Sequence, residues 1–206
     1  MHVLLINGSP HEKGCTYTAL SLVAGELNAA GITTEILNVG TKPVGGCIGC
    51  GGCAKGNGCV FGGVVNEAIE KARTADAFVF GTPVHYASAS GNMTSFMDRL
   101  AYAGGRYLAY KPAAICCSAR RAGTTSTLDQ LVKYPEFFHM PLVSGSYWPM
   151  VHGSNPEQVL QDAEGCAVMQ ELGRNMAWLL RCIEAGKAAG IQHPENPRRP
   201  MTNFIR

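Results

Sequence analysis

Short apolar runs alternate with amphipathic segments along most of the chain, and this alternation most constrains the fold. The runs at 3–6, 77–80 and 113–117 contain no charged residue. Such runs are typical of strands buried on both faces of a parallel sheet. Between them, apolar residues recur at helical spacing from about 16, over 64–73, over 91–101 and over 125–133. The alternation therefore predicts an α/β fold in which helices cover both faces of a parallel sheet.

Two further strands, over 33–39 and near 141–146, bring the predicted sheet to five strands, and a long helix over about 156–185 follows. Right-handed crossovers then favour a flavodoxin-like doubly wound sheet of order 2-1-3-4-5. In this fold the ligand lies beyond the carboxyl ends of the strands. We expect one domain over 1–190, with a cysteine- and glycine-rich loop at 40–63, and an extended C-terminal tail over 191–206.

The overall charge excludes several classes of partner. Basic residues number 17 and acidic residues 15, which gives a net charge of +2 and no case for nucleic acid or an anionic membrane. No apolar run reaches the roughly 18 residues of a membrane helix, and the N-terminus lacks the basic lead of a signal peptide. We expect a cytoplasmic protein. Its nine cysteines then favour a metal or redox role over a disulfide framework.

Four of these cysteines lie close together, at Cys47, Cys50, Cys53 and Cys59, with the spacing C-x2-C-x2-C-x5-C. Four thiolates are the usual ligands of a 4Fe–4S cluster or of a structural zinc. Zinc ligands more often come as two separated pairs. Free or reversibly oxidised thiols, and a glycine-rich lid whose cysteines only pack, are the remaining alternatives.

The other cysteines have simpler interpretations. Cys116 and Cys117 lie in a predicted core strand, and Cys166 and Cys182 lie on the long helix, where cysteine usually behaves as a small buried hydrophobe. Cys15 differs, because it lies at a predicted helix N-terminus that would stabilise a thiolate. We assign Cys15 no catalytic role.

The loop after the first strand joins a buried strand to a helix N-terminus, which is a common anion site. It is neither a Walker A loop nor G-x-G-x-x-G, and its hydroxyl groups come from Ser9, Thr16 and Thr18. Neutral donors of this kind suit a terminal phosphate held without a metal. An ordinary turn with Thr16 as the helix cap is the alternative.

Two more loops directly follow core strands. One contains Thr82, Pro83, Val84, His85 and Tyr86, and the other contains Ser118, Arg120, Arg121 and Gly123. Taken alone, the histidine and the arginines are ordinary surface residues. Together, however, the loops after strands one, three and four would meet at the carboxyl edge of the sheet.

These loops resemble those of the NADPH-dependent FMN reductase-like flavoproteins. The resemblance rests on Gly8-Ser9-Pro10 with Thr16, on Thr82-Pro83-Val84-His85-Tyr86, and on Phe96-Met97-Asp98-Arg99. The four-cysteine loop is similar to that of the iron–sulfur flavoproteins within this family. The specific match covers roughly the first hundred residues.

The resemblance implies FMN, bound through two sets of residues. The phosphate set is Ser9, Pro10, Cys15, Thr16 and Thr18, and Cys15 stands where relatives often carry asparagine. The ring set is Thr82, Pro83, Val84, His85 and Tyr86, with Ser118, Arg120, Arg121 and Gly123 on the other side. The resemblance further implies a 4Fe–4S cluster on Cys47, Cys50, Cys53 and Cys59.

The function that follows is an FMN-dependent NAD(P)H oxidoreductase. Its acceptor would be a quinone, a nitro or azo compound, free flavin or an iron–sulfur centre. The cofactor carries the chemistry, so no catalytic residue is required, although His85 or Tyr86 could donate a proton to an acceptor. The alternatives are a flavin electron carrier with a protein partner, and a metal- or nucleotide-binding regulator on the same fold. The resemblance also implies a homodimer or homotetramer.

Overall fold

The computed structural model describes residues 1–195 and 202. Residues 196–201 and 203–206 of the expected C-terminal tail (191–206) lie outside the described residues. The described part of that tail, 191–195, is exposed and has no regular secondary structure.

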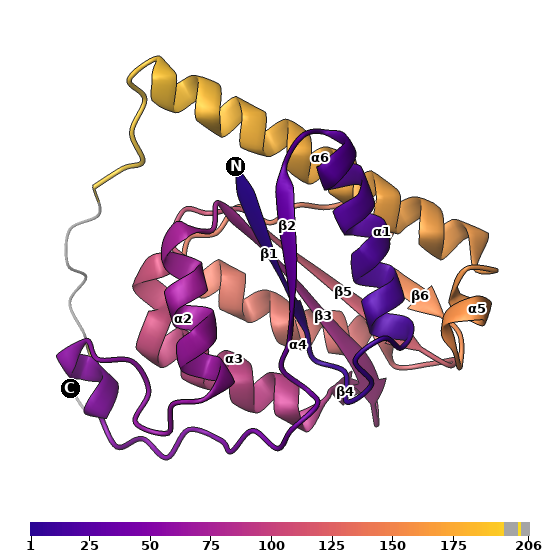
Figure 1. The fold of residues 1–206 in the computed structure, drawn as a ribbon, viewed down its shortest axis with the longest axis horizontal. Coiled ribbons are helices and arrows are strands. Elements are labelled where there is room, and N and C mark those ends of the chain that lie inside the picture. Colours follow the sequence, from indigo (N-terminus) through magenta and orange to yellow (C-terminus); the bar gives the residue numbers. More distant parts are fainter. Residues whose placement is uncertain (196–201, 203–206) are drawn as a thin grey trace.

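A parallel sheet forms the centre of the molecule (Figure 1), and its strand order is β2-β1-β3-β5-β6. A two-residue strand, β4, pairs antiparallel with the end of β3 and lies off this path. Without β4, the order along the sheet is 2-1-3-4-5, so the predicted topology is confirmed. The strands are β1 (His2–Asn7), β2 (Thr33–Asn38), β3 (Ala77–His85), β4 (Ser88–Ala89), β5 (Ala113–Ala119) and β6 (Met150–His152).

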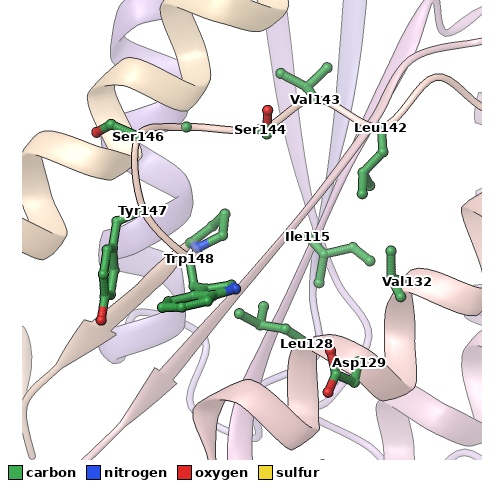
Figure 2. Close-up of a pocket in the computed structure, with 12 residues that line it drawn as sticks. Ile115, Leu128, Asp129, Val132, Leu142, Val143, Ser144, Ser146, Tyr147 and Trp148 are labelled. Atoms are coloured by element: carbon green, nitrogen blue, oxygen red, sulfur yellow. The ribbon is translucent and has the colours of Figure 1, made fainter.

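The prediction of a fifth strand near 141–146 was wrong in position. Leu142 makes only an isolated bridge to Ala113, and the strand itself begins at Met150. The segment before β6 instead forms one wall of a cavity of about 440 Å³ beside the sheet. Figure 2 shows Leu142 and Trp148 of this segment together with Leu128, whose side chain closes the cavity from another element.

Helices cover both faces of the sheet (Figure 1) because strand side chains alternate between them. Leu4 and Phe78 pack on one face, under α2, α3 and α4, whereas Val3 and Val79 pack on the other, under α1 and α6. The helices are α1 (Cys15–Ala29), α2 (Val64–Thr74), α3 (Gly91–Gly104), α4 (Thr124–Phe137), α5 (Pro156–Val159) and α6 (Ala163–Ala188), with short 3-10 turns η1 (Gly52–Lys55) and η2 (Gly105–Tyr107).

The helix predicted over 156–185 is divided in two. Its first turn, α5, ends at Val159, and Asp162 caps the start of α6 by accepting a hydrogen bond from the Gly165 N–H at 3.0 Å. Within the described ranges, no helix has both the length and the apolar character needed to cross a membrane.

Candidate functional site

Three loops meet at the carboxyl edge of the sheet. The hydroxyls of Thr16, in the first turn of α1, and Ser118, near the end of β5, are 2.8 Å apart and both residues are buried. Ser118 thus belongs to the strand and not to the loop predicted for it. The Gly8 N–H donates to the Gly81 carbonyl at 2.8 Å, which ties the first loop to β3. Ser90, at the start of α3, donates from its hydroxyl to the Gly8 carbonyl at 2.8 Å. The structure therefore brings the loops after β1, β3 and β5 together.

The first loop leaves the N-terminus of α1 open to an anion. Gly14 occupies the cap position, no side chain caps the helix, and its first turn has no acidic residue. The first N–H groups and the helix dipole therefore present positive partial charge toward this edge. Ser9 is buried beside them, and its hydroxyl accepts a hydrogen bond from the His11 N–H at 3.1 Å. The uncapped helix end and the buried Ser9 hydroxyl are therefore on the same loop.

Cys15 and Thr18 are directed to protein carbonyls. The Cys15 thiol donates to the Gly153 carbonyl at 3.6 Å, and burial raises its pKa despite an opposing backbone hydrogen bond. The expected stabilisation of a thiolate by the helix N-terminus is therefore outweighed, and Cys15 is a thiol at neutral pH. The Thr18 hydroxyl donates to the Gly14 carbonyl at 3.2 Å, one turn earlier.

β3 is longer than predicted, because Thr82–His85, expected in a loop, are its last four residues and join β4 in a tight hairpin. Thr82 is buried, Pro83 and Val84 are half-buried, and His85 and Tyr86 are exposed. Tyr86 and Ala87 form the two-residue turn with φ values of 51° and 58°, a conformation that favours glycine or asparagine.

Helix α4 supports this strained turn from the side. The Ser126 hydroxyl donates to the Ala87 carbonyl at 2.8 Å, and the Gln130 side-chain oxygen accepts from the Ser88 hydroxyl at 2.8 Å and the Ala89 N–H at 2.9 Å. The turn therefore holds Tyr86 fully exposed at its tip.

The loop after β5 runs beside the hairpin. Gly123 has a φ of 93°, and a Cβ atom there would lie 2.7 Å from the Ala87 Cα, so glycine is required for the close approach. Arg120 and Arg121 are exposed at this edge. The Arg121 carbonyl lies 3.1 Å from the His152 ring nitrogen Nε2.

The cysteine-rich loop, 40–63, leaves β2 and runs along the outside of α2 and α3 (Figure 1). Two asparagines of these helices hold it. The Asn92 amide donates to the carbonyls of Gly40 and Lys42 at 2.9 and 3.0 Å. The Asn66 side chain accepts from the Cys59 N–H at 2.8 Å and donates to the Cys59 carbonyl at 3.0 Å. These two hydrogen bonds from Asn66 fix the backbone of Cys59, the last of the four cysteines.

All four predicted ligands line one cavity of about 540 Å³, together with Phe61, Arg99 and Tyr102. Cys47 and Cys50 are exposed, whereas Cys53 and Cys59 are half-buried. Within residues 1–195 and 202, no three histidine, cysteine, aspartate or glutamate side chains lie close enough together to hold one metal ion. The four thiols therefore share one cavity, and two of them are open to solvent.

The remaining cysteines do not contribute to this cavity. Burial raises the pKa of Cys117 to about 12 and raises that of Cys116 further. The Cys166 thiol donates to the Val159 carbonyl at 3.1 Å, and burial raises its pKa as well. Cys182 is exposed on α6, so its expected burial was wrong.

Comparison with protein families identifies the chain. A model of the NADPH-dependent FMN reductase family matches residues 1–155, which include the three loops and the cysteine-rich segment. The chain belongs to this family. Membership makes it an FMN-dependent oxidoreductase or electron-transfer protein, as the resemblance implied.

Curated relatives of this family member include iron–sulfur flavoproteins. An iron–sulfur flavoprotein of Methanocaldococcus jannaschii is 27% identical over 192 residues, which cover 89% of this chain and 100% of the relative. An iron–sulfur flavoprotein of Archaeoglobus fulgidus is 29% identical over 196 residues, covering 91% and 96%. Among solved structures, a flavodoxin from Archaea has the same fold, with a TM-score of 0.60, 11% identity and coverage of 88% and 99%.

Several residues of the site were not predicted from the sequence. Asn66, Asn92 and Ser90 were given no role, although each joins a loop of the site to a helix. Arg99 was part of the motif that carried the resemblance, again without a role. No periodic pattern marks these positions, because their roles depend on hydrogen bonds to irregular loops.

Proposed function

We propose that this family member is an FMN-dependent NAD(P)H oxidoreductase that also carries a 4Fe–4S cluster. The observation that carries the flavin half is the contact of the buried Thr16 and Ser118 hydroxyls at the uncapped N-terminus of α1, with the buried Ser9 in the loop that leads to it. Three buried hydroxyls and free backbone N–H groups suit a phosphate monoester.

The residues present fit FMN along the whole edge. The phosphate would be held by Ser9, Thr16 and the first N–H groups of α1, with Pro10 shaping the loop. The ring would lie against the hairpin at Thr82–Tyr86 and be flanked by Ser118 and Gly123. The exposed Arg120 and Arg121 would neutralise phosphates of the nicotinamide donor. When bound, FMN accepts a hydride and returns the electrons singly or as a pair.

The cysteine cavity fits an iron–sulfur cluster better than a zinc ion. Its four thiols line one space, and they come from one compact C-x2-C-x2-C-x5-C run, whereas zinc ligands more often come as two separated pairs. Four cysteine thiolates are the usual ligands of a 4Fe–4S cluster, so Cys47, Cys50, Cys53 and Cys59 would hold it. The left-handed glycines at 49, 51, 56, 58, 62 and 63 also let the backbone wrap closely around such a group.

The proposal is tested by the absorption spectrum of anaerobically purified protein, with FMN and iron counted per chain. We expect about one FMN, and about four irons that contribute a broad shoulder near 400 nm. NADH and NADPH oxidation with a quinone then tests turnover. A colourless protein with stoichiometric zinc would contradict both halves, and flavin bands without iron would leave a plain flavin reductase.

Replacing His85 with alanine tests proton donation at the site. His85 is exposed at the end of β3, where it can reach an acceptor bound against the flavin. We expect quinone reduction to slow roughly 10²-fold, the lower end of what general acid catalysis contributes. Ferricyanide, which takes single electrons and no proton, is the control acceptor. Equal quinone turnover by the unaltered protein and the alanine variant would show that His85 does not donate the proton.

A second function, electron transfer to a protein partner, is favoured by the mouth of the cysteine cavity. Ile48, Val60, Phe61 and Tyr102 are 66%, 61%, 53% and 74% exposed there. Exposed apolar side chains around a redox centre suit docking of another protein or of a second subunit. Sedimentation equilibrium would report a homodimer or homotetramer. Negligible turnover with every small acceptor would favour the electron carrier.

A further inference from the structure

Arg99 is a buried cation without a carboxylate partner in the described part of the chain. Its residue is 6% exposed, and none of the ion pairs formed by residues 1–195 and 202 includes it. The adjacent carboxylate, Asp98, accepts a hydrogen bond from the Tyr134 hydroxyl instead. Because buried arginine is rarely found unpaired, this charge calls for an anion nearby.

The guanidinium of Arg99 is directed at the cysteine-rich loop. Its Nε donates to the Cys59 sulfur at 3.2 Å, and its two terminal nitrogens donate to the Gly45 and Gly62 carbonyls at 3.3 and 3.1 Å. Its Cζ atom lies 5.3 Å from the centre of the Phe61 ring. Arg99 also lines the cavity shared by the four cysteines. The positive charge therefore faces the cavity that the four cysteines line.

We propose that Arg99 is the counter-charge of the sulfur centre and raises the reduction potential of the cluster held by Cys47, Cys50, Cys53 and Cys59. This inference rests on the proposed function. A thiolate-bound cluster is negatively charged, and accepting an electron makes it more so. A buried cation that also donates a hydrogen bond to a ligand sulfur stabilises the reduced form more than the oxidised form. Arg99 is thus a positioning and tuning residue, separate from the ligands.

The experiment compares two substitutions of Arg99 with a matched substitution of Arg106. Arg106 also donates to the loop, at the Gly56 carbonyl (3.3 Å), but its contact is exposed and it does not line the cavity. The unaltered protein, Arg99→Gln, Arg99→Lys and Arg106→Gln are purified anaerobically and their iron and FMN are counted. The cluster is then titrated with dithionite in the presence of mediators and followed by electron paramagnetic resonance.

We expect Arg99→Gln to shift the cluster potential to more negative values, with Arg99→Lys closer to the unaltered protein and Arg106→Gln changing it least. The FMN potential should stay the same in all variants. An unchanged cluster potential in Arg99→Gln, or an equal shift in Arg106→Gln, would overturn the inference.

Two outcomes based on iron content are also decisive. If Arg99→Gln loads no cluster, the potential of Arg99→Lys decides: a value near that of the unaltered protein supports the inference, and a clearly lower one overturns it. Loss of iron in both Arg99 variants, but not in Arg106→Gln, would show that Arg99 only anchors the loop and would overturn the inference. An unaltered protein without iron would refute the proposed cluster itself, and the inference with it.

Discussion

Replacing Cys50 with serine is expected to lower the iron content from about four atoms per chain to less than about one, with FMN retained. Cys50 is an exposed member of the set that lines the cavity. A cluster that loses one of four thiolates, at a position open to water, is readily lost. The loops at the carboxyl edge of the sheet contain none of the four cysteines, so the flavin should stay bound. Iron analysis and the visible spectrum measure both.

Cys182→Ser is the matched control for this prediction. Cys182 is also an exposed cysteine, but it lies on α6 and does not line the cavity. Its replacement should leave iron and flavin unchanged. Equal iron in the Cys50 and Cys182 variants would show that Cys50 is not a ligand, and flavin loss in Cys50→Ser would show that the two sites depend on each other.

Replacing Gly40 with alanine is expected to weaken FMN binding at least about tenfold, which is about 1.4 kcal/mol, and to destabilise the fold by about 1–3 kcal/mol. A Cβ atom on Gly40 would overlap the backbone carbonyls of Ser9 and Gly8. These are main-chain atoms of the loop before α1, so no side-chain rotation can relieve the overlap. The loop must move, and with it the groups proposed to hold the phosphate.

Gly45→Ala provides the comparison for Gly40→Ala. Gly45 lies in the same loop, its φ is outside the left-handed region, and a Cβ atom there would meet nothing within 4 Å. This variant should stay within about 0.5 kcal/mol of the unaltered protein. Thermal unfolding reports stability, and quenching of flavin fluorescence by apoprotein reports affinity. Equal FMN affinities of Gly40→Ala and Gly45→Ala would show that Gly40 does not shape the loop proposed to hold the phosphate.

The parts of the fold that depend on local pattern were predictable from sequence. The apolar runs that became β1 and β3 follow from burial on both faces, and the order of the sheet follows from right-handed crossovers in a doubly wound fold. β6 was misplaced because Met150–His152 is only three residues long, and its pattern is weaker than that of the segment before it. A strand this short is defined by its neighbour β5 rather than by its own composition.

The residues of the candidate site were also predictable only in part. Ser9 and Thr16 could be proposed because they directly follow a strand that the sequence identifies. Asn66, Asn92 and Arg99 could not, because their roles depend on hydrogen bonds to a loop that no periodicity describes. The pKa of Cys15 could not be predicted either, since the burial that raises it arises when Gly153 packs against it.

The anchors of the cysteine-rich loop have a consequence for how this family can diversify. Asn66, Asn92, Arg99 and Arg106 lie on α2, α3 and η2, and none belongs to the strand-end loops that meet at Thr16 and Ser118. Residues 41–63 could therefore be replaced by a shorter connection without rebuilding the loops at the strand ends, because only Gly40 must be kept for its close approach to Ser9. If the proposed cluster is confirmed, its gain or loss amounts to exchanging one short segment of the gene, while the flavin-binding scaffold stays the same.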